Sequence, residues 1–158
     1  MELRQYKVSD CNEIWQLFYD TVHTVNAKDY TQEQLNVWAP QSNDFVEWGN
    51  SRLRQNAAEI IVAVEDKKII GFGSIVITTG YLDFLYVHKN NIGKGVGTAI
   101  CNELEKRSQI NGITTFASIT ARSFFEKRGF EIVRVNKVER NGVVLRNYLM
   151  IKHNNENK

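Results

Sequence analysis

The sequence predicts a mixed α/β fold with seven strands and five helices, and three observations lead to this class. Segments with apolar residues at helical spacing alternate with short segments that have the pattern of strands. Residues 66–68 and 79–80 are links short enough for hairpin turns, which makes the strands beside them antiparallel. The last two strands flank Asn141-Gly142, a pair that a type I′ hairpin turn favours.

The chain begins with a strand and an amphipathic helix. Residues 2–8, ELRQYKV, form the predicted strand. Asp10 followed three residues later by Glu13 predicts a capping box, in which two side chains satisfy free N–H groups at the start of a helix. The apolar face of this helix is formed by Ile14, Leu17, Phe18 and Val22.

Two further helices precede the central strands. Thr31 with Gln34 predicts a second capping box, and its helix must end before Pro40, because the residue before a proline avoids the helical conformation. A third helix covers about residues 44–54, and three strands follow over 59–65, 69–78 and 81–88.

The C-terminal half continues the alternation and closes on a hairpin. A long helix is predicted to carry Ala99, Ile100, Leu104 and Ile110 on its apolar face and to stop at Gly112. The last elements are a strand over 113–118, a helix over 121–130 that ends at Gly129, and a hairpin of 131–140 with 143–152.

Three glycines, Gly93, Gly95 and Gly97, lie between a predicted strand and a predicted helix. The first N–H groups of a helix lack partners and carry partial positive charge, and glycines let a ligand approach them closely. The stretch therefore predicts a cradle for phosphate or pyrophosphate, to which Lys94 adds a charge. The alternative is a tight turn with a close contact between helix and sheet. The spacing fits neither a Walker A motif nor the dinucleotide fingerprint.

Two stretches in this order resemble motifs of the GNAT superfamily of N-acetyltransferases. Residues 86–100, YVHKNNIGKGVGTAI, look like its acyl-CoA-binding motif, and residues 117–133, ASITARSFFEKRGFEIV, look like its second motif. Residues 21–40 and 140–152 are similar to a YafP-like bacterial branch of that superfamily. The resemblance covers nearly the whole chain. It implies a GNAT-like, mostly antiparallel seven-stranded sheet, flanked by helices and splayed between the fourth and fifth strands.

The resemblance implies acetyl-CoA as a co-substrate and no metal. Relatives often carry Gln or Arg where this chain has Ile92, and a tyrosine acid where it has Phe125. The residues expected to contact acetyl-CoA are Leu85, Tyr86, Val87, Ile92, Gly93, Lys94, Gly95, Val96, Gly97, Thr98, Ser118, Phe124, Phe125 and Lys127.

The resemblance also implies direct attack of an amine on the thioester, which needs a group that accepts the amine's proton. Asp83 interrupts an apolar strand at a position where relatives often carry a glutamate base. The alternative interpretation of Asp83 is an acid that faces solvent or pairs with a nearby cation. His88 ends the same strand, as a proton relay or as an exposed residue. A thiolate with a pKa near 8.5 leaves without full protonation. Tyr148, or Ser118 through a water, could still replace the missing tyrosine acid.

Oxyanion donors and the acceptor pocket complete the expected site. The donors are backbone N–H groups near Leu85, Tyr86 and Val87, where the fourth strand of the family bulges. Candidate contacts to the acceptor combine an apolar body with a polar tip: His23, Tyr30 and Trp38. The alternatives are a core tryptophan beside Pro40 and a tyrosine that caps a helix.

Composition limits the class of protein. A net charge of +2 is too small to indicate nucleic acid as a partner, and the longest apolar runs are too short to span a membrane. Cys11 and Cys101 indicate neither a disulfide framework nor a metal site, and MELRQYKVSD has no signal-peptide core. We expect a cytoplasmic protein with one domain over residues 1–152 and a polar tail over 153–158, and a homodimer is compatible with the resemblance.

Three functions from different classes follow. The first is an acetyl-CoA-dependent N-acetyltransferase that acts on a primary amine of a small molecule or peptide. The second is a non-catalytic acyl-CoA-binding module, suggested by Ile92 and Phe125. The third is a nucleotide-binding regulatory domain.

Overall fold

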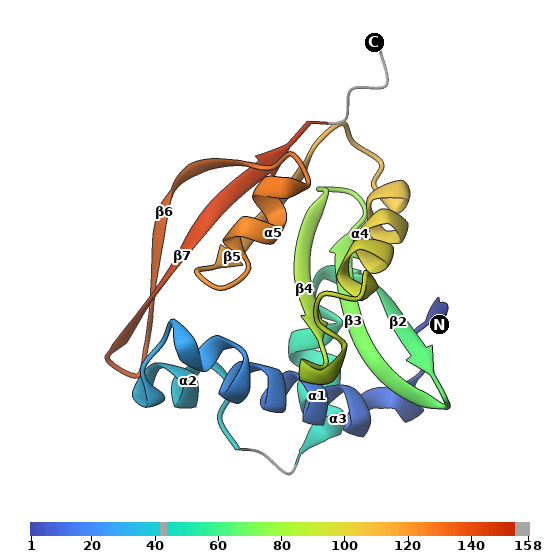
Figure 1. The fold of residues 1–158 in the computed structure, drawn as a ribbon, viewed down its shortest axis with the longest axis horizontal. Coiled ribbons are helices and arrows are strands. Elements are labelled where there is room, and N and C mark those ends of the chain that lie inside the picture. The colour runs from blue at the N-terminus through green and yellow to red at the C-terminus, as the bar shows by residue number, and fades with distance from the viewer. Residues whose placement is uncertain (42–43, 154–158) are drawn as a thin grey trace.

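The computed structural model describes residues 1–41 and 44–153, and its elements follow the predicted order (Figure 1). Residues 154–158 of the predicted tail lie outside the described residues. The strands are β1 (Glu2–Gln5), β2 (Glu59–Glu65), β3 (Lys68–Val76), β4 (Tyr81–Val87), β5 (Ile113–Ser118), β6 (Glu131–Arg140) and β7 (Val143–Lys152). The helices are α1 (Cys11–Thr24), α2 (Gln32–Trp38), α3 (Phe45–Trp48), α4 (Val96–Arg107) and α5 (Arg122–Lys127). A π-helical turn (Gly49–Leu53) follows α3, and short 3-10 turns cover Val8–Asp10, Asn26–Lys28, Gln55–Ala57 and Lys89–Asn91.

The seven strands form one sheet in the order β1-β2-β3-β4-β5-β7-β6. Every neighbouring pair is antiparallel except β4 and β5, which run parallel. The turn between β6 and β7 has positive φ at Asn141 (50°) and Gly142 (78°), which confirms the predicted type I′ turn. The mixed, mostly antiparallel sheet expected from the sequence is therefore present, and the β5-β7-β6 part diverges from β2–β4 (Figure 1).

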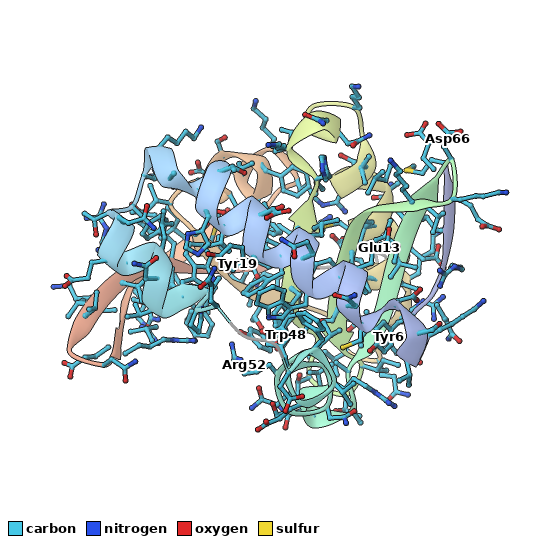
Figure 2. The ribbon with its side chains drawn as sticks, turned by 90° about the horizontal axis from the view of Figure 1, so that it is seen from below. Tyr6, Glu13, Tyr19, Trp48, Arg52 and Asp66 are labelled. Atoms are coloured by element: carbon cyan, nitrogen blue, oxygen red, sulfur yellow. The ribbon has the colours of Figure 1, made fainter. Side chains whose placement is uncertain are left out.

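Helices cover both faces of the sheet and enclose two apolar clusters. On one face, residues of α4 and α5 pack on β2–β5 and β7; on the other, residues of α1 and α2 pack on β2–β4. Seen from the second face, α1 crosses the sheet with Trp48 beside it (Figure 2), and the Trp48 ring lies 5.3 Å from that of Phe18. Gly73 lets α4 approach β3 closely, because a Cβ atom there would lie 2.8 Å from Ile100. This contact packs the middle of α4 against β3.

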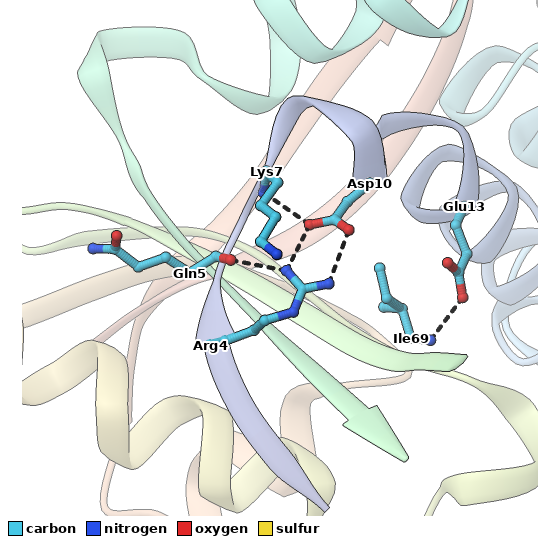
Figure 3. A network of polar contacts seen from close by, with 6 residues as sticks. All are labelled: Arg4, Gln5, Lys7, Asp10, Glu13 and Ile69. Atoms are coloured by element: carbon cyan, nitrogen blue, oxygen red, sulfur yellow. Dashed lines mark hydrogen bonds and ion pairs between the residues drawn. The ribbon is translucent and has the colours of Figure 1, made fainter. Parts of the chain in front are cut away.

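The capping box predicted at Asp10 and Glu13 is wrong, because both carboxylates bind elsewhere (Figure 3). Asp10 accepts two hydrogen bonds from the Arg4 guanidinium, at 2.9 and 3.0 Å, and one from the Lys7 N–H at 2.8 Å. Glu13 accepts the N–H of Ile69 at 2.7 Å. The paired bonds between Arg4 and Asp10 join two ions and tie the start of α1 to β1, and the Glu13 bond ties α1 to β3.

The capping box at Thr31 and Gln34 is confirmed, with both reciprocal hydrogen bonds formed. The predicted end of the long helix is wrong, because α4 stops at Arg107 and Ser108 is extended. The N–H of Gln109 instead donates to the Ile77 carbonyl at 3.0 Å. Ile110 therefore leaves the apolar face, and 45% of its surface is exposed.

Candidate active site

Strand β4 carries a β-bulge at Asp83. Ser74 of β3 lies opposite Phe84 and the next residue, Ile75, lies opposite Leu82, so Asp83 has no opposing residue on β3. The Ser74 hydroxyl accepts the N–H of Phe84 at 3.2 Å and satisfies this donor beside the bulge. The bulge falls at Asp83, before the Leu85–Val87 stretch where the resemblance placed it.

The bulge changes the face on which the side chains of β4 lie. Leu82 belongs to the cluster under α4, whereas Phe84 belongs to the cluster under α1. In a regular strand, residues two apart share one face. Asp83 consequently lies where β4 passes from one packing arrangement to the other.

Strands β4 and β5 separate just after they meet. Their parallel pairing includes only Tyr81 with Thr114 and Leu82 with Thr115, and the Thr115 hydroxyl donates to the Leu82 carbonyl at 2.9 Å. Residues 83–87 of β4 thus have no pairing partner on β5. This free edge is the splay that the resemblance implied between the fourth and fifth strands.

A first cavity of about 480 Å³ opens along this free edge. Thr21, Asn26 and Lys28 line it from the first helical layer, Asn91 from the turn after β4, and Thr120 from the turn after β5. Lys94 and Lys127, which we expected at the cofactor, are not among its lining residues. The expected residues that do line it are Leu85, Tyr86, Val87, Ile92, Gly93, Gly95, Val96, Gly97, Thr98, Ser118, Phe124 and Phe125.

The glycines of the cradle serve two purposes. Gly93 and Gly95 have φ of 79° and 85°, which side chains rarely adopt, and Gly95 is the N-cap of α4. Gly97 lies in the first turn of α4, where a Cβ atom would lie 3.4 Å from the Phe124 ring. The first helical hydrogen bond of α4 runs from the Ala99 N–H to the Gly95 carbonyl. The N–H groups before Ala99 therefore have no partner within the helix and can bind an anion.

A second, smaller cavity of about 140 Å³ lies between the first helical layer and the β6–β7 hairpin. It includes Phe18 of α1, Arg52 of the π-helical turn, and Arg140 of β6. Five residues line both cavities: Trp38, Asp83, Tyr86, Phe116 and Ser118. The two cavities therefore meet at the bulge, and the Asp83 carboxylate lies at their junction.

Asp83 is the carboxylate that borders both cavities. Burial raises the pKa of Asp83 above its ordinary value of 3.8, while Arg52 and a hydrogen bond with Tyr81 act in the opposite direction. Burial raises the pKa of Tyr81 as well, and so does the neighbouring Asp83. Tyr81 is therefore the donor in this bond, and a carboxylate with a raised pKa is suited to accept a proton.

Tyr86 also borders both cavities. Burial raises the pKa of its hydroxyl, and a hydrogen bond with the Trp38 side chain opposes this effect. Because an indole N–H can only donate, Tyr86 oxygen is the acceptor and its own proton stays available. The sequence reasoning placed Tyr86 at the cofactor and did not consider its hydroxyl for proton transfer.

The other predicted catalytic residues lie in different surroundings. The Ser118 hydroxyl borders both cavities and accepts the N–H of Ala121 at 3.0 Å, so it shapes the turn before α5. Tyr148 lines neither cavity; the guanidinium groups of Arg122 and Arg146 lie 5.1 and 5.8 Å from its ring centre. Phe125 borders the first cavity, and only 3% of its surface is exposed.

The three residues expected to contact the acceptor lie in different places. Trp38 lines both cavities, and Tyr30 lines the second one. His23 lines neither: its Nε2 lies 2.8 Å from the Ala39 carbonyl, and its ring lies 4.2 Å from that of Tyr19. His88, considered as a relay, accepts the N–H of Asn90 at its Nδ1 and thereby caps the short turn after β4.

Thr21 and Asn26 are cavity residues that the sequence reasoning missed. The Thr21 hydroxyl donates to the Val87 carbonyl at 3.3 Å, and the Asn26 amide lies 3.5 Å from the Ser118 hydroxyl. Both residues are buried. The available signal was Thr21 itself, a polar residue at helical spacing from Leu17 and Phe18 on an apolar face.

Within residues 1–41 and 44–153, no three His, Cys, Asp or Glu side chains are grouped so that they could hold a metal ion. Over the same residues, no helix is long and apolar enough to cross a bilayer.

Comparison with known proteins assigns the class. Residues 26–152 match the model of a family described as an acetyltransferase (GNAT) domain. This chain belongs to the GNAT family of acetyltransferases. The uncharacterized N-acetyltransferase YafP of Escherichia coli K12 is 28% identical over 152 residues, which cover 95% of this chain and 94% of YafP.

Solved structures show the same fold. A GCN5-related N-acetyltransferase from Rhodopseudomonas palustris superposes with a TM-score of 0.88 at 30% identity, over 97% of this chain and 95% of that one. The PaiA N-acetyltransferase of Thermoplasma acidophilum, solved in complex with coenzyme A, superposes with a TM-score of 0.74 at 18% identity, over 97% and 98% of the two chains.

Proposed function

We propose that this protein is an acetyl-CoA-dependent N-acetyltransferase that transfers an acetyl group to a primary amine by direct attack on the thioester. The observation that carries the proposal is the junction of the two cavities at the bulge of β4. A donor in one cavity and an acceptor in the other meet there, beside the Asp83 carboxylate.

The first cavity suits the coenzyme A part of the donor. Its glycine cradle offers N–H groups to the pyrophosphate, and the free edge of β4 offers backbone groups to the amides of the pantetheine arm. Ile92 lines this cavity without a polar side chain, so the backbone takes the larger part in binding the pyrophosphate. The T. acidophilum relative, solved with coenzyme A, supports this use of the fold.

Proton transfer follows from the groups at the junction. An amine with a pKa of about 10.4 is mostly protonated at neutral pH and must lose a proton before it attacks. Asp83 accepts this proton, directly or through a water. The nitrogen then bonds to the acetyl carbon, and N–H groups on the free edge of β4 stabilise the negative oxygen. The attached nitrogen gives up its second proton to solvent, and the carbon–sulfur bond breaks to leave the amide.

The thiolate that leaves carries the bonding electrons and takes up a proton from solvent or from a nearby acid. We assign this role to Tyr86 in preference to Tyr148, because Tyr86 borders both cavities and Tyr148 borders neither. In this assignment, the Tyr86 hydroxyl on β4 takes the role that the resemblance gave to a tyrosine at the position of Phe125. Since the thiolate is a tolerable leaving group, this acid assists the reaction and is not essential to it.

The experiment is an assay of thiol release from acetyl-CoA with a library of primary amines, combined with calorimetric titration of acetyl-CoA and ATP. We expect acetyl-CoA to bind, ATP not to compete, and thiol release to depend on the amine. Acetyl-CoA binding without release by any amine would identify a binding module instead. Binding of ATP in place of acetyl-CoA would identify a nucleotide-binding domain.

A further inference from the structure

The second cavity combines aromatic walls with an excess of positive charge. Seven of its fifteen lining residues are aromatic, three are arginines, and Asp83 is the one acid among them. A flat apolar body suits such walls, and guanidinium groups bind carboxylates and phosphates through paired hydrogen bonds. This cavity therefore has the chemistry to recognise more than an amine.

Two of the arginines enter the cavity from different parts of the chain. Arg52 extends from the π-helical turn toward the side of the molecule where α2 lies (Figure 2). Arg140 is the last residue of β6 and shares a strand face with Val138, which also lines the cavity. The third arginine, Arg146, has its guanidinium 5.8 Å from the centre of the Tyr148 ring. Tyr148 belongs to the apolar cluster under α4 and α5.

Arg52 and Arg140 line the same cavity as Asp83, and the charge of Arg52 opposes the rise in the pKa of Asp83. Over residues 1–41 and 44–153, neither arginine forms an ion pair within 4.0 Å. Burial lowers the pKa of Arg140, and the neighbouring Arg52 lowers it further. Arg140 is half-buried and Arg52 is exposed, so the unfavourable term is the repulsion between two like charges, which a bound anion would relieve.

We infer that the acceptor is a small primary amine with a flat apolar body and an anionic group, and that Arg52 and Arg140 bind this group while the amine lies at Asp83. The inference rests on the proposed function and specifies its acceptor. The anionic group is a carboxylate or a phosphate, since a pair of guanidinium groups suits both. The small volume of the cavity favours a small molecule over a folded protein.

The test compares three acceptors with the same amine and ring: tyramine, 4-(2-aminoethyl)benzoate and tyramine O-phosphate. Tyramine carries a neutral phenol opposite the aminoethyl group, whereas the other two carry a carboxylate or a phosphate there. Because this group is remote from the amine, the amine pKa changes little across the series. We expect at least one anionic amine to exceed tyramine in kcat/KM by at least about tenfold, mainly through a lower KM. The order of the benzoate and the phosphate identifies the preferred anion.

Arginine variants locate the effect. Arg52→Gln and Arg140→Gln should each remove most of the preference for the anionic amine, and Arg140→Lys should restore part of it. The matched control is Arg134→Gln, because Arg134 is an exposed arginine of β6 that lines neither cavity. This control should keep the full preference. Circular dichroism and acetyl-CoA affinity establish that each variant is folded.

Each contrary result has a separate meaning. Equal turnover of tyramine and both anionic amines by the wild type overturns the inference and leaves the proposed acetyltransferase intact. A preference that survives both Arg52→Gln and Arg140→Gln overturns the assignment of these arginines. Absence of thiol release with every amine, in a protein that binds acetyl-CoA, overturns the proposed function and the inference together.

Discussion

The hydroxyl of Tyr30 donates a hydrogen bond to the carbonyl oxygen of Arg146 at 2.7 Å, between residues 116 positions apart. The hydroxyl oxygen of Tyr30 also accepts a hydrogen bond from the N–H of Ile119 at 3.0 Å. The segment before α2 is thereby joined to β7 and to the end of β5, where the second cavity is formed. The polar tip of Tyr30 is thus bound to backbone groups, while its ring faces the cavity.

Tyr30→Phe should destabilise the protein. It removes one donor and one acceptor and leaves a partly buried carbonyl and N–H without this partner, at a cost of about 1–3 kcal/mol in the free energy of unfolding. Urea denaturation measures the loss. Tyr19→Phe is the matched control, since the Tyr19 ring stacks 5.2 Å from Trp15 on α1. Equal losses in the two variants would contradict the special role of Tyr30.

Gly97→Val should weaken coenzyme A binding at least about tenfold, or 1.4 kcal/mol, while the fold survives. Gly97 lines the first cavity in the first turn of α4, so a branched side chain occupies space beside the cradle. Calorimetric titration with coenzyme A measures the effect. Ala99→Val, in the same turn but outside the cavity lining, should bind normally. Unchanged affinity in folded Gly97→Val would count against the cradle.

Phe125 should act through packing. Its ring lies 5.2 Å from Phe124 and 5.0 Å from Phe130, so Phe125→Ala should cost about 3–5 kcal/mol of stability. Phe125→Tyr adds a hydroxyl where the resemblance implied a tyrosine acid, and it should raise the rate by no more than about tenfold, below the 10²–10⁴ of a required acid. An inactive wild type that this substitution activates by about 10³ or more would favour the binding module.

The raised pKa of Asp83 makes stability depend on pH in a defined direction. The folded protein holds the Asp83 proton more tightly than the unfolded chain, so ionisation of this carboxyl favours unfolding. Wild-type stability should therefore fall relative to Asp83→Asn as the pH rises from about 3.8 through the folded-state pKa. Denaturant titrations of both proteins across this range measure the difference. A difference that stays constant with pH would contradict the assignment.

Much of the fold was predictable because its signals are local. The bounds of β2, β5, β6 and β7 match the predicted strands, and the Thr31 capping box and the Asn141-Gly142 turn formed as expected. The failed capping box at Asp10 depends on Arg4, whose position is set by the pairing of β1 with β2. No local pattern reveals such a partner, because tertiary contacts decide between competing acceptors.

The candidate site was predictable in part for the same reason. The cradle is one continuous stretch, and Asp83 is conspicuous as an acid in an apolar strand. The bulge that places Asp83 at the junction arises from its register against Ser74 and Ile75, which composition does not specify. The second cavity, which Arg52 and Arg140 both line, likewise joins segments far apart in the chain.

The kinetics of Asp83→Asn test the central claim most directly. The amide keeps the shape of the carboxyl but cannot accept the amine's proton. With the best amine from the library, we expect kcat/KM to fall by about 10²- to 10⁴-fold, with acetyl-CoA affinity nearly unchanged. The limb of the pH–rate profile on which activity rises as Asp83 ionises should also be altered. Wild-type turnover by a folded Asp83→Asn protein would contradict the account of acetyl transfer at the junction of the two cavities.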